Sequence, residues 1–278
     1  MPSLHRARAV CLAVAVAASL SVLGGCGDDA NKDTYKERPV EILYNEAMDL
    51  LNQEEYTLAA KAFDEVERQH PYSVWATKAQ LMAAYAQYQH NKFDEAVIAL
   101  DRFIQLHPSH KDVAYAYYLK ALCYYEQIAD VTRDQKMTDH AMKALQEVVD
   151  RFPNSKFARD AKLKIDLARD HMAGKEMAVG RYYLRQGQYL AAINRFRMVV
   201  DNYQTTTHIP EALHRLIECY EALGLTDEAK RTAAVLGFNY PGSEWYTDSY
   251  GLVKGDLPKD QQPVEDPKKS SGWFSWLW

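Results

Sequence analysis

The side chains of this sequence that could do chemistry directly are its histidines and cysteines. His107 and His110 stand on either side of Pro108, and the other histidines are scattered singly. Protein metal sites use closer or repeated spacings such as HExxH or paired CxxC, and neither occurs in the sequence. A glycine-rich phosphate loop and a GxSxG nucleophile elbow are also missing. We therefore expect no catalytic residues, no metal ligands and no bound cofactor, and an enzyme is the least favoured class.

Cys26 differs from the other cysteines because of its place in the sequence. Basic residues within the first eight positions precede an apolar stretch over residues 9–23. That stretch is short for a membrane span and is typical of the core of a signal peptide. It ends in Leu23-Gly24-Gly25-Cys26, which is similar to a bacterial lipobox. The chemistry expected at Cys26 is attachment of a diacylglyceryl group to the thiol and of an acyl chain to the new amino terminus. The alternative is an ordinary signal peptide that contains a cysteine.

A lipid on Cys26 would decide where the chain resides. Residues 1–25 are expected to be a lipoprotein signal peptide and residues 26–39 a flexible polar tether. Several acyl chains anchor a protein firmly where one chain does not. Gly27 follows the cysteine where an aspartate would signal retention in the enterobacterial inner membrane. The expected location is therefore the periplasmic face of the cell outer membrane.

Repeated helix pairs organise the rest of the sequence. Ala59, Phe63 and Val66 lie at i, i+4 and i+7, one face of a helix, and Pro71 stops that helix. The same spacing recurs in Ala96, Leu100 and Phe103; in Ala141, Leu145 and Val148; in Ala192, Phe196 and Val199; and in Ala229, Ala233 and Leu236. The matching terminators are Pro108, Pro153, Gln204 in place of a proline, and Pro241.

Each of these apolar triplets lies on the second helix of a pair, and the first helix of the same pair carries a small or medium side chain at the matching position. The residues at this position are Ala47, Ala84, Ala121, Gly180 and Ile217. A small residue on the first helix, an alanine on the second and a proline at the end form the tetratricopeptide pattern of about 34 residues. The usual tryptophan is missing, so the copies over residues 40–245 are divergent. We expect an all-α tetratricopeptide-repeat α-solenoid of five helix pairs, the first made of residues 40–52 and 55–69.

Two irregularities divide the array. The polar segment 130–138 predicts a longer turn in the third repeat, and residues 155–186 predict one extended first helix in the fourth repeat, in which Gly174 is a weak point. This helix separates repeats 1–3, residues 40–154, from repeats 4–5, residues 155–250. Cys123 and Cys219 fall two repeats apart and are expected to be small buried side chains without a disulfide.

The C-terminal segment and the net charge of the chain both indicate which kinds of partner to expect. Residues 251–278 are expected to be a disordered tail with an aromatic end, Trp273 to Trp278. That end could dock on a partner, lie at a membrane interface or fold back on the repeats. The net charge of −5 is spread over interleaved acidic and basic residues, so no broad basic surface for nucleic acid is expected.

A closer resemblance rests on four segments together with the cysteine motif and the five repeats. They are HPSHKDVAYAYYLKALCYYEQ (107–127), RFPNSKFARDAKLKI (151–165), YYLRQGQYLAAINRFRMVV (182–200) and YPGSEW (240–245). These resemble the BamD family, also called ComL, of the outer-membrane β-barrel assembly machine. The resemblance implies a non-enzymatic lipoprotein subunit whose partners are unfolded outer-membrane β-barrel proteins, the periplasmic domains of the barrel-forming subunit BamA, and other lipoproteins of the complex. The alternative is a generic periplasmic repeat lipoprotein in cell-envelope or peptidoglycan assembly.

The resemblance and the repeat alignment also suggest contact residues. Arg195 matches an arginine that the family uses toward BamA; otherwise it is a solvated arginine on a helix face. First helices of tetratricopeptide repeats line the inner groove, which gives the candidates for a substrate-peptide groove: Tyr44, Met48, Lys78, Tyr85, Tyr88, Tyr115, Tyr118 and Tyr125. The alternative is that several of these rings pack between neighbouring helices. Tyr124 falls on the packing row and serves as a comparison.

The lipid assignment predicts the behaviour of Cys26→Ala. Without the thiol no acylated mature form can arise, so the variant should be soluble in the periplasm or remain as uncleaved precursor. Membrane fractionation followed by mass spectrometry of the N-terminal peptide tests this. Normal outer-membrane fractionation of the variant would contradict the lipobox assignment.

Overall fold

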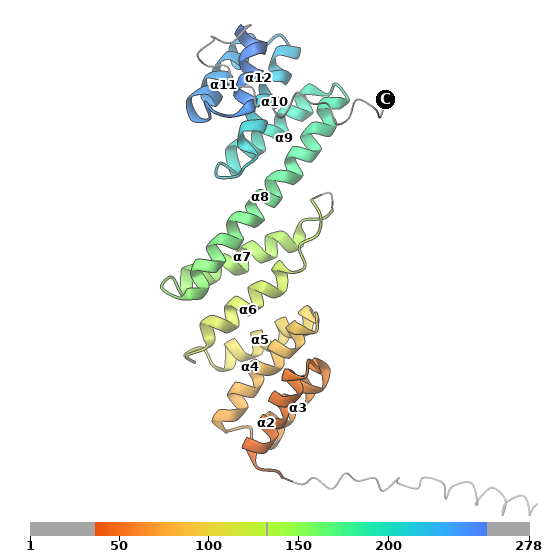
Figure 1. Ribbon diagram of the computed structural model, residues 1–278, viewed down its shortest axis with the longest axis vertical. Helices are drawn as coiled ribbons and strands as arrows, with labels where there is room; N and C mark the ends of the chain where they lie inside the picture. Colours follow the sequence, from red (N-terminus) through yellow and green to blue (C-terminus); the bar gives the residue numbers. More distant parts are fainter. Residues whose placement is uncertain (1–36, 132, 255–278) are drawn as a thin grey trace, which may run out of the picture. The chain divides into compact units, whose positions relative to one another are not determined.

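The computed structural model describes residues 37–131 and 133–254 (Figure 1). The signal segment, Cys26 and most of the tether lie outside the described residues, as do residues 255–278. The described part contains eleven α-helices and no strand. They are α2 (Val40–Asn52), α3 (Tyr56–Gln69), α4 (Val74–Gln89), α5 (Phe93–Leu106), α6 (Val113–Tyr125), α7 (Lys136–Arg151), α8 (Lys156–Arg185), α9 (Tyr189–Asn202), α10 (Ile209–Ala222), α11 (Thr226–Asn239) and α12 (Glu244–Lys254).

Helices α2 to α11 form five antiparallel pairs, as the sequence predicts. Each helix packs against the one before it and the one after it in the chain, so every second helix lies between two first helices. First helices of successive repeats also touch, α2 with α4, α4 with α6 and α6 with α8. This is a tetratricopeptide-repeat α-solenoid, and the predicted fold class is confirmed.

The periodic row on each second helix forms the core. Phe63, Phe103 and Phe196 are fully buried, and so are the other members of the five rows except Ala233, which is partly buried. The facing positions Ala47, Ala84, Ala121, Gly180 and Ile217 are buried as well. Burying a Phe or Leu side chain stabilises a fold by about 1.5–3 kcal/mol, so these rows supply much of the driving force.

Serine caps set where several first helices begin. The Ser73 hydroxyl oxygen accepts a hydrogen bond from the Ala76 backbone N–H at 3.0 Å, and Ser155 accepts one from Ala158 at 3.1 Å. An N-terminal cap of this kind contributes about 1 kcal/mol by satisfying a backbone donor that the helix leaves free. The Pro-x-Ser triplet therefore ends one repeat and starts the next.

The extended helix of the fourth repeat is confirmed as α8, which runs without a break through Gly174. Two loops pack on its middle. His171 Nε2 lies 2.7 Å from the Ala129 carbonyl oxygen, and the Asp170 carboxylate accepts hydrogen bonds from the backbone and the hydroxyl of Thr207. A side chain at Gly174 would come within 3.2 Å of His208 Nε2, so glycine permits this close approach.

The loop of the third repeat differs in its bounds from the prediction. It follows Tyr125 and ends before Lys136, where α7 begins, so the last three residues of the expected turn are helical. The Thr138 hydroxyl donates to the side-chain oxygen of Gln135 at 2.7 Å, and both side chains are buried. This local bond lets the helix start earlier than the polar sequence suggests.

The end of the C-terminal repeats was predicted wrongly. Residues 251–254 were assigned to a disordered tail, but they belong to α12, a helix that the sequence analysis did not foresee. The reason is tertiary packing. Ser249 is fully buried with its hydroxyl 2.8 Å from His214 Nδ1 on α10, and the Trp245 ring packs on the His214 ring at 5.2 Å. Val253 packs against the same core, which extends the helix.

The two cysteines of the described part are buried and unbonded, as expected. Burial raises the pKa of the Cys123 thiol to about 12 and that of Cys219 to about 11. Since the thiolate is the reactive form, neither thiol is a nucleophile near neutral pH.

Gly180 gives a direct test of the packing between first and second helices. A Cβ atom there would lie 2.5 Å from the Phe196 ring, so Gly180→Ala should lower the free energy of unfolding by about 1–3 kcal/mol although alanine is the better helix former. Thermal unfolding followed by circular dichroism measures it. Gly242→Ala is the control, because a Cβ at Gly242 meets no atom within 4 Å. Equal melting temperatures for Gly180→Ala and Gly242→Ala would contradict the packing.

Candidate substrate groove and partner contact

All eight predicted groove residues lie on the first helices α2, α4 and α6, and all are partly buried. These helices are also the ones that touch from repeat to repeat. The row of candidates therefore follows the junctions between successive first helices. What each side chain contacts there decides between the two alternatives that the sequence leaves open.

Three tyrosines of α6 reach across to α8. The Tyr115 and Tyr118 rings pack on Phe157 with centroid distances of 5.5 and 5.2 Å. The Tyr118 hydroxyl also donates a hydrogen bond to the Asp160 carboxylate. The Tyr125 ring lies 4.7 Å from the Lys164 ammonium, a cation–π contact. The α6–α8 junction thus combines aromatic rings with the Tyr118 hydroxyl and two charged side chains of α8, Asp160 and Lys164.

The earlier junctions follow the same plan. Tyr44 of α2 packs on Trp75 of α4 at 4.8 Å, and the Lys78 ammonium covers the Trp75 ring at 4.9 Å. Tyr88 of α4 reaches the carboxylate of Glu126, just beyond α6, at 3.5 Å. The remaining candidates behave alike: Met48 packs against the core of the first repeat, and Tyr85 packs on two core clusters while its hydroxyl accepts from Gln89.

Four of these hydroxyls lie close enough to affect one another. Burial, followed by the charges of neighbouring groups, raises the pKa of Tyr88 and of Tyr115 to about 12. Tyr85 contributes to both shifts, and burial together with the Asp160 hydrogen bond raises the pKa of Tyr118 as well. The raised pKa values keep the hydroxyls of Tyr88, Tyr115 and Tyr118 uncharged at neutral pH and well above it. They offer aromatic faces with O–H groups and no net charge, which suits an apolar chain with free backbone carbonyls.

The contacts support the packing alternative for most of the rings, since each has a partner on a neighbouring helix. Partial exposure leaves part of each ring free for a ligand, so the groove assignment stays a prediction. Tyr124 lies on another side of α6, where its ring packs 5.6 Å from His140 of α7. Tyr118 and Tyr125 instead face α8, so Tyr124 is a suitable comparison within the same helix.

Arg195 lies on α9, and its Nη1 donates to the Glu176 carboxylate of α8 at 3.0 Å. The arginine side chain is 39% exposed and Glu176 is 13% exposed. The guanidinium is therefore both partly exposed on the helix face and held by a partly buried partner. A guanidinium has five N–H donors, so one ion pair leaves others for a further carboxylate. The role toward a partner protein stays a prediction.

Sequence reasoning missed a charged network in the C-terminal repeats. Glu211 of α10 accepts two hydrogen bonds at 2.8 Å from Arg181 of α8. Arg215 contacts both Glu211 and Glu218, and although burial opposes it, hydrogen bonds from His214 and Arg215 lower the pKa of Glu218. The pairs within α10 have the spacing of one helical turn and could have been found in the sequence. The link between α8 and α10 could not.

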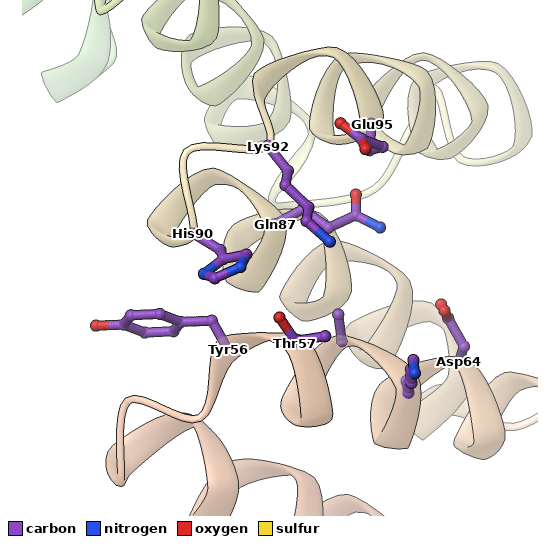
Figure 2. A pocket seen from close by; sticks show the side chains of 9 residues that line it. Tyr56, Thr57, Asp64, Gln87, His90, Lys92 and Glu95 are labelled. Atoms are coloured by element: carbon purple, nitrogen blue, oxygen red, sulfur yellow. The ribbon is translucent and has the colours of Figure 1, made fainter.

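A separate pocket of about 160 Å³ lies between α3 and the turn that joins α4 to α5. Figure 2 shows its labelled side chains, among them Asp64, Gln87, Lys92 and Glu95. The Gln87 side-chain oxygen is buried without a hydrogen-bond partner. None of the predicted groove residues lines this pocket, and acidic and basic side chains alternate around it. Its size and lining suit bound water rather than a peptide.

No group of three or more His, Cys, Asp or Glu side chains in residues 37–131 and 133–254 is placed to hold a metal ion. Across the same residues, no helix combines the length and the apolar character that crossing a membrane requires.

The sequence is similar to that of known proteins of one family. The family model described as YfiO, an outer membrane lipoprotein, matches residues 36–236. The Caulobacter vibrioides protein "Outer membrane protein assembly factor BamD" is 51% identical over 260 residues, which cover 93% of this chain and 83% of that protein. The chain belongs to the BamD family. Members of the same name from Rickettsia prowazekii and Neisseria meningitidis are 49% and 36% identical, over 84% and 87% of this chain and 92% and 94% of theirs.

Proposed function

We propose that this BamD family member is a non-enzymatic, lipid-anchored subunit of the machinery that assembles β-barrel proteins into the outer membrane. The observation that carries the proposal is the 51% identity, along 93% of the chain, to a relative named as an outer membrane protein assembly factor. In this proposal the lipid on Cys26 anchors the chain at the periplasmic face. The N-terminal repeats receive unfolded barrel proteins, and the C-terminal repeats hold the periplasmic domains of BamA beside other lipoproteins.

The chemistry of an unfolded barrel segment is consistent with the tyrosine row. Such a segment is extended, alternates apolar and polar side chains, carries aromatic residues near the membrane boundary, and has unpaired backbone carbonyls. Uncharged tyrosines that are already packed against neighbouring helices offer rigid aromatic area with little loss of conformational entropy. Their hydroxyls can donate to backbone carbonyls without selecting a particular sequence. A surface of this kind can accept many barrel proteins.

Copurification separates this proposal from a generic repeat lipoprotein of the cell envelope. The full-length protein carrying an affinity tag is captured from detergent-solubilised outer membrane, and the captured proteins are identified by mass spectrometry. The proposal expects a barrel-forming subunit with periplasmic domains in near-equal amount. Capture of peptidoglycan enzymes without any such barrel protein would favour the alternative.

Arg195→Glu tests the partner contact. If the guanidinium meets a carboxylate of BamA, reversing its charge should weaken capture of the BamA periplasmic domains at least about tenfold. Arg68→Glu is the control, because Arg68 is also paired with a glutamate, Glu65, but on α3 of the first repeat. Binding of the purified domains is measured by calorimetry, with circular dichroism to confirm the fold.

Glu176→Gln distinguishes a contact from a packing effect. It keeps Arg195 but removes the ion pair between α8 and α9. A direct contact predicts that Glu176→Gln retains binding, since the guanidinium stays available. Equal loss of binding in Arg195→Glu and Glu176→Gln would assign the effect to the α8–α9 packing instead.

The tyrosine row is tested by changing Tyr85 and Tyr118 together to Ala. Truncating two aromatic contacts should weaken binding of a C-terminal barrel peptide about tenfold or more, measured by fluorescence anisotropy or crosslinking. Tyr124→Ala is the control: it removes the contact with His140 and should lower the melting temperature with little change in peptide affinity.

Tyr118→Phe adds a second check on the same surface. It keeps the ring on Phe157 and removes only the hydroxyl that donates to Asp160. Its fold is therefore expected to be retained even where the double alanine variant is less stable. Peptide binding by the folded double variant that equals wild type would show that these rings serve packing alone.

A further inference from the structure

The last described helix, α12, stands where the first helix of a sixth repeat belongs. Pro241-Gly-Ser243 precedes it as Pro71-Tyr-Ser73 precedes α4. The Ser243 hydroxyl accepts from the Tyr246 backbone N–H at 3.2 Å, as Ser73 accepts from Ala76. Helix α12 packs on both α10 and α11, as α4 packs on α2 and α3 (Figure 1). In the described part of the chain no second helix follows it.

The second repeat shows where such a second helix would sit. There α5 packs on α4, and its Arg102 side chain reaches Glu67 of α3. The residues at this junction are Asp64 and Glu67 of α3, Gln80 and Ala83 of α4, and Ala99, Arg102 and Phe103 of α5. Aligning Ser73 with Ser243 pairs the four residues of α3 and α4 with Ala234, Gly237, Tyr250 and Val253. All four line an open groove of about 540 Å³ between α11 and α12. The groove therefore occupies the position at which the second helix of a sixth repeat would pack.

The side chains that line this groove differ in chemistry from those at the matching junction of the second repeat. In the second repeat Glu67 accepts from Gln80 at 2.8 Å and pairs with Arg102 of the incoming helix. In the groove, Gly237 stands at the position of Glu67 and Tyr250 at the position of Gln80. Lys230 is the one charged side chain among the residues that line the groove. Phe238 also lines it and is 87% exposed. An occupant of this groove must therefore be apolar and aromatic rather than an ordinary charged repeat helix.

Gly237 fixes the shape of the groove. A Cβ atom at this position would lie 2.7 Å from the Tyr246 ring, so glycine lets α12 approach α11 closely. The Tyr246 and Tyr250 rings meet edge to face at 6.1 Å. Together with Phe238 they give the groove an aromatic wall, and its volume falls within the range of about 300–1,000 Å³ typical of ligand sites.

We propose that the segment Trp273-Phe274-Ser275-Trp276-Leu277-Trp278 of the same chain binds in this groove. It is the one run of large apolar side chains after α12, and the residues that connect it, 255–272, are mainly polar and charged. The connection leaves α12 after Lys254, the residue next to Val253, which lines the groove, and it can span at most about 60 Å. A tethered segment has an effective concentration of the order of millimolar, so even weak affinity fills the groove.

Binding of this segment completes the end of the solenoid. A repeat array needs a cap because its last repeat would otherwise leave an apolar face in water. The aromatic segment covers the exposed Phe238 ring and the face of α12 that carries Tyr250. In a longer array, the second helix of a sixth repeat would cover the same surface. The occupant is therefore a segment of the chain itself rather than a membrane or a second copy.

Site-specific photocrosslinking tests the proposal in the full-length protein. Benzoylphenylalanine replaces Phe238, cells are irradiated, and the purified adduct is digested and mapped by mass spectrometry. The expected adduct joins position 238 to the peptide that contains residues 273–278 and migrates as a monomer. Coexpression of isotopically heavy and light chains should give adducts of purely heavy or purely light peptides.

Two variants and their control sharpen the result. Ala234→Asp places in the groove the carboxylate that Asp64 supplies in the second repeat, and it should lower the yield of the tail adduct at least fivefold. Val235→Asp is the control, because Val235 is exposed on the same helix but does not line the groove. Changing Trp273, Trp276 and Trp278 together to Ser should remove the adduct while leaving α2 to α12 untouched.

The same experiment can overturn the proposal. Adducts that map to lipid, to another protein or to a second copy would assign the groove to that occupant. A tail adduct whose yield is unchanged by Ala234→Asp and by the triple Trp variant would show that the contact is not specific. Absence of any adduct on residues 273–278 would reject it outright.

Discussion

The close approach of each second helix to the first helix of its own repeat is the constraint on which this structure depends. Phe196 can be fully buried only because Gly180 has no side chain, and Phe63 relies in the same way on Ala47. One helix pair cannot bury its apolar faces alone, so each pair must be followed by another. The successive contacts of α2, α4, α6 and α8 are a consequence of that stacking.

Those contacts in turn place the tyrosines. Tyr44, Tyr88 and Tyr118 each project from one first helix toward the next, and burial at the junction raises the pKa of each hydroxyl. Packing and binding are therefore not exclusive roles for these rings. A ring that already contacts a neighbouring helix is rigid, so its remaining exposed part keeps a fixed orientation at the surface.

Helix α8 connects the two candidate sites physically. Its N-terminal turns supply Phe157, Asp160 and Lys164 to the tyrosines of α6, and its C-terminal half supplies Glu176, which holds Arg195, and Gly180, which admits Phe196. Both loops that pack on its middle bond to it through side chains at positions 170–175. One continuous helix therefore serves the junctions on either side of it.

The sequence by itself determined the repeat pattern, the number of helix pairs, the long fourth-repeat helix and the buried rows, because these depend on local periodicity and on where prolines and serines stop and start helices. It also indicated the family, through motifs that lie on those same helices. Only the tertiary structure decided that Arg195 is paired with Glu176, that the tyrosines contact the next first helix, and that residues 244–254 form α12. These features depend on side chains from different repeats meeting in space, as His214 meets Ser249, and no spacing along the chain encodes such a meeting.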